Sequence, residues 1–87
     1  MFVILTYDFH SKRVGKALKI CRKYLVRVQN SVFEGDITEK NLELLKKELS
    51  IIINKQEDTL LIYSFGSKKY SKKECFGKEK NCQKIFF

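Results

Sequence analysis

The sequence predicts a single α+β domain in which strands alternate with two amphipathic helices. The chain has 87 residues, a length that is usual for one domain. Its composition of 44% hydrophobic and 32% charged residues is ordinary for a folded globular protein. Two segments repeat apolar residues every three or four positions, as amphipathic helices do, and strand-like apolar runs flank both. Two helices packed on a sheet are therefore expected.

The first part of the chain is expected to form a strand, a helix and a further strand region. Phe2–Tyr7 is a continuous apolar and β-branched run, typical of a buried strand. Ser11 is expected to cap a helix over residues 12–24, because Ser is a favoured cap residue. Val26–Glu34 has the composition of a strand, but Asn30-Ser31 interrupts it. This region can therefore form one strand or two.

The second part is expected to add a turn, a helix and a strand. Gly35-Asp36 is typical of a turn. Thr38 is expected to cap a helix over residues 39–53, whose leucines and isoleucines form one apolar stripe. The polar residues 56–58 indicate a turn, and Thr59–Phe65 has the composition of a strand.

If residues 26–34 form two strands, the order is βαββαβ, which is the ferredoxin-like arrangement with an antiparallel sheet. Right-handed crossovers then place both helices on one face of the sheet. The other face has no cover and is expected to dock a partner, most simply a second copy of the chain. We expect residues 1–66 to form this core and residues 67–87 to form a basic C-terminal strand and tail. The apolar end of the tail packs either on a partner or on its own domain.

The charge indicates the class of partner. The formal net charge is +8, and residues 10–27 carry seven Lys and Arg without an acid. Residues 66–87 carry seven lysines against two glutamates. Such an excess on a small domain favours a polyanion, either nucleic acid or an anionic membrane, although a solvated lysine-rich surface gives the same composition.

A membrane is the less favoured of these partners. No apolar run approaches 18 residues, and the N-terminal residues lack the basic lead of a signal peptide. The apolar stripe of the first helix is modest and is needed by the sheet. A cytoplasmic location is expected.

The cysteines and the histidine indicate no metal or disulfide scaffold. Three cysteines without a CxxC pair, together with one histidine, predict neither a disulfide framework nor a zinc site. Free thiols are expected at Cys75 and Cys82, whose role the sequence leaves open. His10 is expected to be a loop residue rather than a metal ligand.

Asp8 is the candidate for chemistry. It is the only acid in residues 1–33, and it lies between an apolar strand and a basic helix. Mg²⁺ is commonly held by one or two carboxylates together with water and substrate phosphates. A two-fold axis near Asp8 would supply a second carboxylate from a partner chain. Alternatively, Asp8 is a turn or cap residue that accepts a backbone hydrogen bond near Ser11.

Three segments resemble the CRISPR-associated protein 2 family of the spacer-acquisition module. They are Tyr7-Asp8, Lys12-Arg13-Val14 and, most specifically, Gln-Asn-Ser-Val-Phe-Glu-Gly at residues 29–35. Residues 76–81 resemble the end seen in one branch of the family, so the similarity covers nearly the whole chain. The resemblance implies a ferredoxin-like protomer in a homodimer with facing sheets. It also implies a last strand, within residues 70–76, that extends the partner's sheet.

The resemblance implies two classes of function within prokaryotic antiviral defence. One is a metal-dependent endonuclease, with Mg²⁺ or Mn²⁺ on Asp8, that cleaves single-stranded RNA or double-stranded DNA. The other is a non-catalytic DNA-binding dimer that bridges copies of the CRISPR-associated protein 1 integrase. Both readings can hold together, and a sequence-reading RNA-recognition module is less favoured, because Val32-Phe33-Glu34 lacks the aromatic pair that such a module needs.

The resemblance also gives further residues a role. Arg13 and Arg27 match basic positions linked to nucleic-acid contact, and Arg suits bidentate phosphate binding. Arg27 can instead face solvent, and Ser31 can bind phosphate or simply permit the break between strands. The complete candidate set for nucleic-acid binding is Arg13, Lys12, Lys16, Arg27 and Ser31. The candidates for the interface between protomers are Phe33, Cys75 and Phe76, of which Phe33 can equally belong to the core.

Overall fold

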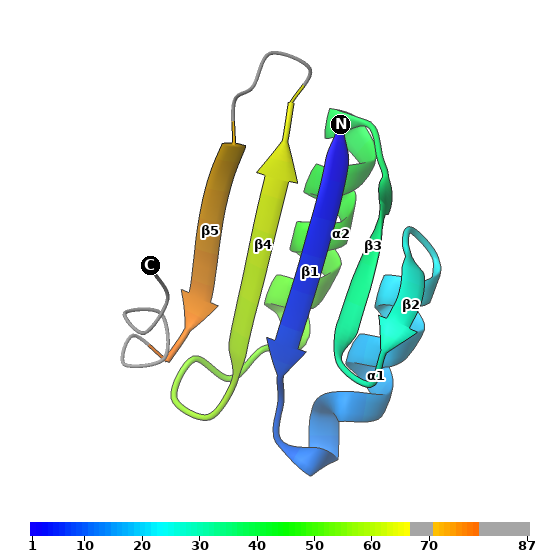
Figure 1. Cartoon of the computed structure of the whole chain (residues 1–87). Helices are drawn as coiled ribbons and strands as arrows, with labels where there is room; N and C mark the ends of the chain where they lie inside the picture. The colour runs from blue at the N-terminus through cyan, green and yellow to red at the C-terminus, as the bar shows by residue number, and fades with distance from the viewer. Residues whose placement is uncertain (67–70, 79–87) are drawn as a thin grey trace.

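The computed structural model describes residues 1–66 and 71–78. In these residues, seven elements form one five-stranded antiparallel sheet of order β2-β3-β1-β4-β5 and two helices (Figure 1). The elements are β1 (Phe2–Asp8), α1 (Ser11–Arg22), β2 (Val26–Gln29), β3 (Val32–Asp36), α2 (Glu39–Ile52), β4 (Thr59–Phe65) and β5 (Ser71–Gly77). The predicted ferredoxin-like α+β fold with an additional C-terminal strand is confirmed.

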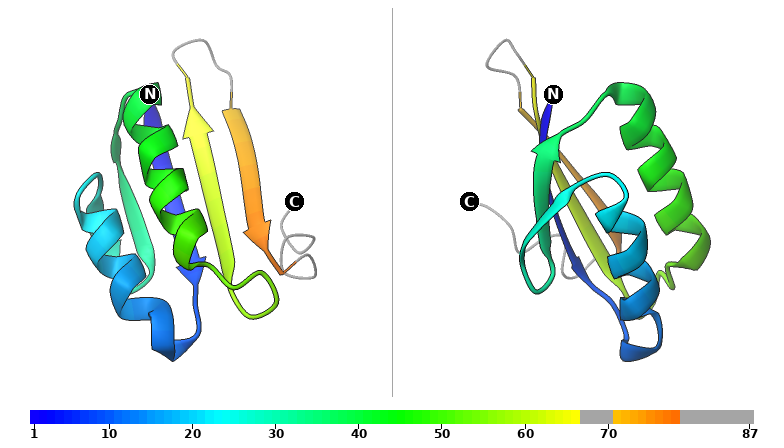
Figure 2. Two further views of the ribbon diagram at one scale, coloured as in Figure 1. Left: turned by 180° about the vertical axis from the view of Figure 1, so that it is seen from behind. Right: turned by 90° about the vertical axis from the view of Figure 1, so that its right-hand side faces the viewer.

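Both helices cover the same face of the sheet, as predicted, and leave the other face open (Figure 2). β1 shows the alternation that this requires, because successive side chains of a strand point to opposite faces. Val3, Leu5 and Tyr7 are buried toward the helices, so Asp8 shares the open face with the half-buried Ile4. The core is formed by these residues of β1 together with buried residues of the other elements, which include Ala17, Cys21, Phe33, Leu42, Leu45, Leu49, Leu60 and Ile62.

The break at Asn30-Ser31 separates two strands, which confirms the two-strand alternative. β2 and β3 pair antiparallel, and the backbone N–H of Tyr7 donates to the Ser31 carbonyl at 3.1 Å. The predicted turn at Gly35-Asp36 is wrong, because both residues pair with β1 as the last two residues of β3. An extended backbone there keeps the ladder with Phe2 and Val3 intact.

The helices begin and end close to the predicted positions. The expected cap at Ser11 is wrong, because His10 caps α1 and its Nδ1 accepts from the Lys12 N–H at 3.1 Å. The cap at Thr38 is confirmed, since its Oγ1 accepts from the Asn41 N–H at 3.1 Å. Neither helix within the described residues is long and apolar enough to cross a membrane.

The C-terminal strand forms within the predicted region. β5 pairs antiparallel with β4 of its own chain, with Leu60 opposite Phe76 and Leu61 opposite Cys75. An exchange of this strand with a second chain stays a prediction, as does the division at residues 66 and 67. The apolar end of the tail lies outside the described residues.

Two cysteines differ in their state. Cys75 is disulfide-bonded, so the expectation of a free thiol there is wrong. Cys21 is a free, fully buried thiol in α1, and burial raises its pKa to about 12. Cys21 is therefore a packing residue, because its thiolate form is scarce at neutral pH.

Candidate functional site

Asp8 lies at the end of β1 with its side chain in solvent. The residue is exposed, lies on the open face and pairs with Thr59 of β4. Its two neighbours in the chain are anchored, since Tyr7 is 5% exposed and Phe9 is 7% exposed. Their rings meet edge to face with centroids 5.5 Å apart. The buried neighbours hold the backbone while the carboxylate points away from them.

The alternative role for Asp8, as a turn or cap residue, is not what the structure shows. His10 occupies the cap position of α1 and provides the accepting atom. Within residues 1–66 and 71–78, the Asp8 carboxylate has no hydrogen bond or ion pair. Its oxygen atoms are therefore accessible to a cation.

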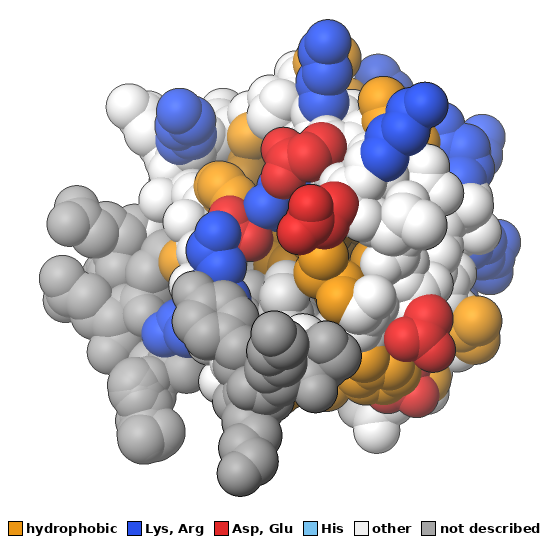
Figure 3. Space-filling model, turned by 90° about the horizontal axis from the view of Figure 1, so that it is seen from above, with side chains coloured by type: hydrophobic (Ala, Val, Ile, Leu, Met, Phe, Trp, Pro, Cys, Tyr) orange, Lys and Arg blue, Asp and Glu red, His pale blue; other side chains and the backbone are white. Residues whose placement is uncertain are grey.

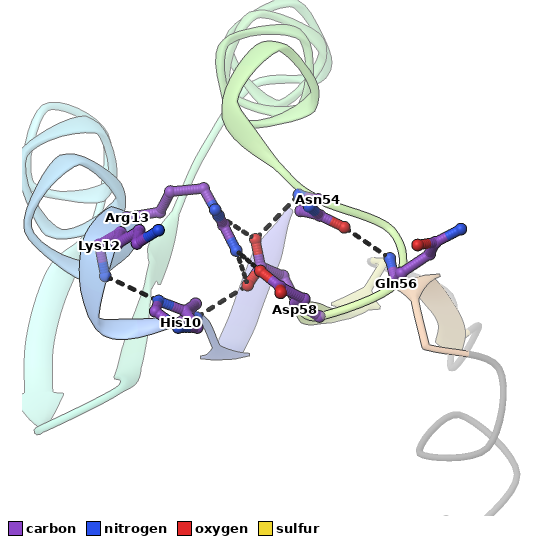
Figure 4. Close-up of polar contacts among 7 residues, drawn as sticks. His10, Lys12, Arg13, Asn54, Gln56 and Asp58 are labelled. Atoms are coloured by element: carbon purple, nitrogen blue, oxygen red, sulfur yellow. Dashed lines mark hydrogen bonds and ion pairs between the residues drawn. The ribbon is translucent and has the colours of Figure 1, made fainter.

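Asp58 lies beside this strand end and has the opposite environment. It precedes Thr59, and its side chain is 0% exposed. Figure 4 shows its polar contacts with His10, Arg13 and Asn54. Oδ1 accepts from the His10 backbone N–H at 2.8 Å and from Arg13 Nη2 at 3.1 Å. Oδ2 accepts from Arg13 Nε at 2.7 Å and from the Asn54 backbone N–H at 2.8 Å. Asp58 thus joins the β1–α1 connection, α1 and the α2–β4 loop.

Hydrogen bonds keep Asp58 charged in this buried position. Burial alone would raise the pKa of its carboxyl group. The Arg13 guanidinium and the backbone N–H groups of His10 and Asn54 outweigh burial and lower the pKa to about 2. Arg13 also pairs with the exposed Glu57 at 2.7 Å, and it lowers the pKa of that carboxyl group.

This network changes the interpretation of Arg13. Its Nε and Nη2 atoms are bonded to Asp58 and Glu57, and its side chain is only 19% exposed. A bidentate phosphate contact would have to replace these bonds. Its guanidinium serves a buried carboxylate in this structure, and the expectation that Arg13 binds nucleic acid stays a prediction.

The role of Asp58 is not predictable from the sequence, whose composition indicates only a polar turn at residues 56–58. The contact joins residues that are 45 positions apart. The only local signal is that a pair of acids precedes β4, while α1 carries cations alone. The backbone of Asp58 also receives the end of β5, since the Lys78 N–H donates to its carbonyl at 3.0 Å. Gly77 approaches this carbonyl so closely that a Cβ would lie 1.9 Å from the oxygen.

The other basic candidates remain on the surface. Lys12 and Lys16 are exposed on α1, together with Lys19 and Arg22, and the exposed Lys23 follows the helix as its C-cap. Arg27 is exposed on the edge strand β2, and its Nη2 donates to the Asn30 carbonyl at 3.2 Å. This contact brings the Arg27 side chain to the β2–β3 turn, beside Tyr7. Lys12 and Arg27 therefore flank the end of the sheet that carries Asp8.

The remaining candidate residues lie in three places, which are the β2–β3 turn, the core and β5. Ser31 lies in the β2–β3 turn at the same end of the sheet as Asp8. Phe33 is 0% exposed and stacks on Tyr7 with centroids 6.0 Å apart. It therefore packs in the core of this chain, and its place at an interface stays a prediction. Cys75 and Phe76 are partly buried in β5.

A group of acids lies at the opposite end of the sheet. Figure 3 looks onto this end and shows Asp and Glu side chains grouped near its middle. They surround a hollow of about 910 Å³ whose lining includes Asp36, Glu39 and Glu43. Lys46 neutralises part of this charge through Glu74 at 2.8 Å.

The fold and this site define a small ferredoxin-like α+β protein with an exposed carboxylate beside a basic helix. Residues 1–73 match the family described as CRISPR associated protein Cas2, and the chain belongs to this family. The protein named CRISPR-associated endoribonuclease Cas2 of Dictyoglomus turgidum is 48% identical over 81 residues, which are 93% of each chain. The protein of the same name from Thermotoga maritima is 48% identical over 80 residues, or 92% of each chain.

A solved structure has the same fold. The crystal structure of Streptococcus pyogenes Cas2 at pH 6.5 superposes with a TM-score of 0.69 at 35% identity, over 78% of this chain and 89% of that chain. The resemblance found in the sequence is therefore confirmed at the level of family and fold.

Proposed function

We propose that this chain is a metal-dependent endonuclease of the spacer-acquisition step of CRISPR defence, acting in the cytoplasm. The observation that carries the proposal is Asp8, an exposed carboxylate at a strand end whose backbone is held by buried neighbours. Single-stranded RNA is the first substrate to test, because the relatives are named endoribonucleases. Double-stranded DNA is the second.

Mg²⁺ or Mn²⁺ fits the donor that Asp8 offers. Carboxylate oxygen is a preferred ligand of these hard cations. Among the residues that the structure describes, no group of three His, Cys, Asp or Glu could hold a metal ion. One chain thus supplies one carboxylate, and phosphates or a second chain complete the ligand set. When bound, such an ion activates a water molecule and neutralises charge on the phosphate.

A homodimer through the open face supplies the second carboxylate. This face carries large apolar residues that no helix covers, among them Phe65, which is 40% exposed. A contiguous apolar face of this kind favours a protein partner. If two open faces pack around a two-fold axis, both Asp8 residues lie on the shared interface. Exchange of β5 between the protomers belongs to the same proposal.

The chain's own basic residues bind and orient the nucleic acid. Lys12 lies two residues after the His10 cap in the first turn of α1, and Arg27 reaches the β2–β3 turn. Both lie at the end of the sheet that carries Asp8. Cations at these places attract phosphates and hold a strand across the carboxylate.

Cleavage on a gel tests the proposal. Labelled single-stranded RNA and duplex DNA are incubated with wild type and Asp8→Asn, each with Mg²⁺ or with EDTA. Cleavage is expected only for wild type with metal. Asp36→Asn is the matched control, because Asp36 is an exposed acid at the opposite end of the open face. Cleavage by Asp8→Asn at the wild-type rate would reject the proposal.

A second candidate function is a DNA-binding scaffold for the CRISPR-associated protein 1 integrase. The observation that favours it is the exposed basic surface of α1, which carries no acid. In this function, reversing the charges of Lys12, Lys16 and Lys19 weakens duplex binding in EDTA and flattens its salt dependence. Asp8→Asn binds as wild type does. A duplex affinity that changes neither with the salt concentration nor with the three charge reversals would reject this candidate function.

A further inference from the structure

Asp8 is held in place from two sides. In the sheet, its partner across the ladder is Thr59, the residue that follows Asp58. In the β1–α1 connection, the His10 N–H, two residues after Asp8, donates to Asp58 Oδ1 at 2.8 Å. Both restraints on the end of β1 therefore converge on the segment of Asp58 and Thr59.

The side chain of Asp58 has no spare acceptor capacity. An ionised carboxylate offers about four acceptor sites, and Asp58 accepts four hydrogen bonds from three residues. Two of these bonds come from Arg13, which is thereby fixed between Asp58 and Glu57. The carboxylate is 0% exposed, so a ligand cannot reach it without unfolding this region.

We infer that Asp58 is a positioning residue for Asp8, and that Arg13 acts through Asp58 rather than on phosphate. The inference rests on the proposed role of Asp8 as a metal ligand. Magnesium accepts little deviation from octahedral geometry, and a functional side chain must be held within about half an ångström. Without Asp58, the β1–α1 connection loses its hydrogen bond at His10, and the Asp8 carboxylate is held less closely for the ion.

Binding of Mn²⁺ alone tests this inference. The dimer is titrated with Mn²⁺ in the absence of nucleic acid, and free Mn²⁺ is measured by electron paramagnetic resonance. Asp58→Asn is expected to weaken binding by about tenfold or more, as loss of a residue that supports a ligand does. The cleavage rate at saturating Mn²⁺ is expected to recover. Unchanged Mn²⁺ affinity in a folded Asp58→Asn protein would overturn the inference.

Two further variants separate positioning from general destabilisation. Glu74→Gln removes a partly buried ion pair between α2 and β5, whose atoms Lys46 Nζ and Glu74 Oε1 are 2.8 Å apart. It is expected to leave Mn²⁺ affinity unchanged. Arg13→Lys keeps the charge but loses the fork of donors, so it is expected to shift affinity in the same direction as Asp58→Asn and less far. It serves as the test if Asp58→Asn does not fold.

Salt dependence decides the role of Arg13 without any use of nuclease activity. Each phosphate contact contributes roughly 0.9 to the slope of log K against log salt on duplex DNA. Arg13→Gln is expected to keep the wild-type slope, whereas a slope lower by about one unit would show a phosphate contact and overturn the assignment.

Hydrogen exchange separates a failure of the inference from a failure of the proposed function. If Asp58 holds the β1–α1 connection, exchange of the His10 amide becomes at least about tenfold faster in Asp58→Asn. Unchanged exchange there would overturn the inference. If instead Asp8→Asn binds Mn²⁺ as wild type does, the proposed function fails, and the exchange measurement still decides the role of Asp58.

Discussion

The two faces of the sheet use an aspartate in opposite ways at the same end. Asp8 lies on the open face, and its exposed carboxylate has no hydrogen bond or ion pair among the described residues. Asp58 lies one ladder position away, is 0% exposed and accepts four hydrogen bonds. The two residues are of the same type, so their environment decides which carboxylate is available to a metal ion and which one stabilises the structure. A free carboxylate can take a cation, whereas a saturated one can only hold structure.

The largest expected difference between the two aspartates is in stability. Asp58→Ala leaves the Arg13 guanidinium and two backbone N–H groups without their acceptor, so it is expected to lower the free energy of unfolding by about 3–5 kcal/mol. Asp8→Ala removes an exposed group and is expected to change it by less than about 0.5 kcal/mol. Urea unfolding of both variants measures this. Equal effects would remove the distinction between the two faces.

Two glycines test how tightly the region around Asp58 is packed. Gly77 has a φ of +104°, and its added Cβ would lie 1.9 Å from the Asp58 carbonyl oxygen. Gly77→Ala is therefore expected to destabilise the fold by more than about 2 kcal/mol. Gly15 in α1 has no atom within 4 Å of an added Cβ, so Gly15→Ala, the control, is expected to stabilise by up to about 1 kcal/mol. Thermal unfolding compares the two. A neutral Gly77→Ala would show that the Asp58 region is loosely packed.

The next largest effect expected is a loss of stability at acid pH, which is due to Asp58. The pKa of Asp58 is about 2 in the folded chain against an ordinary value of 3.8. A lowered pKa stabilises the fold above the ordinary value, and this stability is lost as the pH falls through the folded pKa. About 2 kcal/mol is expected to disappear between roughly pH 4 and pH 2. Unfolding free energies of wild type and Asp58→Asn across this range measure the effect, which should be absent in the variant.

The sequence predicted the fold because its signals are local. The bounds of β4 at Thr59 and Phe65 and the cap at Thr38 follow from composition and spacing, and the structure confirms them. Composition predicts the cap of α1 at Ser11 because Ser is a favoured cap residue, whereas His10 caps the helix in the structure. Gly35-Asp36 was assigned to a turn because its composition is that of a turn, yet ladder pairing with β1 keeps it extended.

The candidate site was predictable only in part. Asp8 was found because an isolated acid ends an apolar run. The contact between Arg13 and Asp58 spans 45 positions, and periodicity says nothing of pairs so far apart. The sequence pattern therefore predicts a free cation at Arg13 and a turn residue at Asp58. The proposed second carboxylate and the proposed metal ion would come from a second chain and from solution, and one sequence contains neither.

The central claim is that Asp8 performs the chemistry while Asp58 supports it. Cleavage of labelled single-stranded RNA by Asp8→Asn and Asp58→Asn, across a Mn²⁺ series, tests this claim most directly. Asp8→Asn is expected to show no cleavage at any Mn²⁺ concentration. Asp58→Asn is expected to approach the wild-type cleavage rate as the Mn²⁺ concentration rises. Cleavage by Asp8→Asn equal to wild type, or a loss in folded Asp58→Asn that no Mn²⁺ concentration restores, would contradict it.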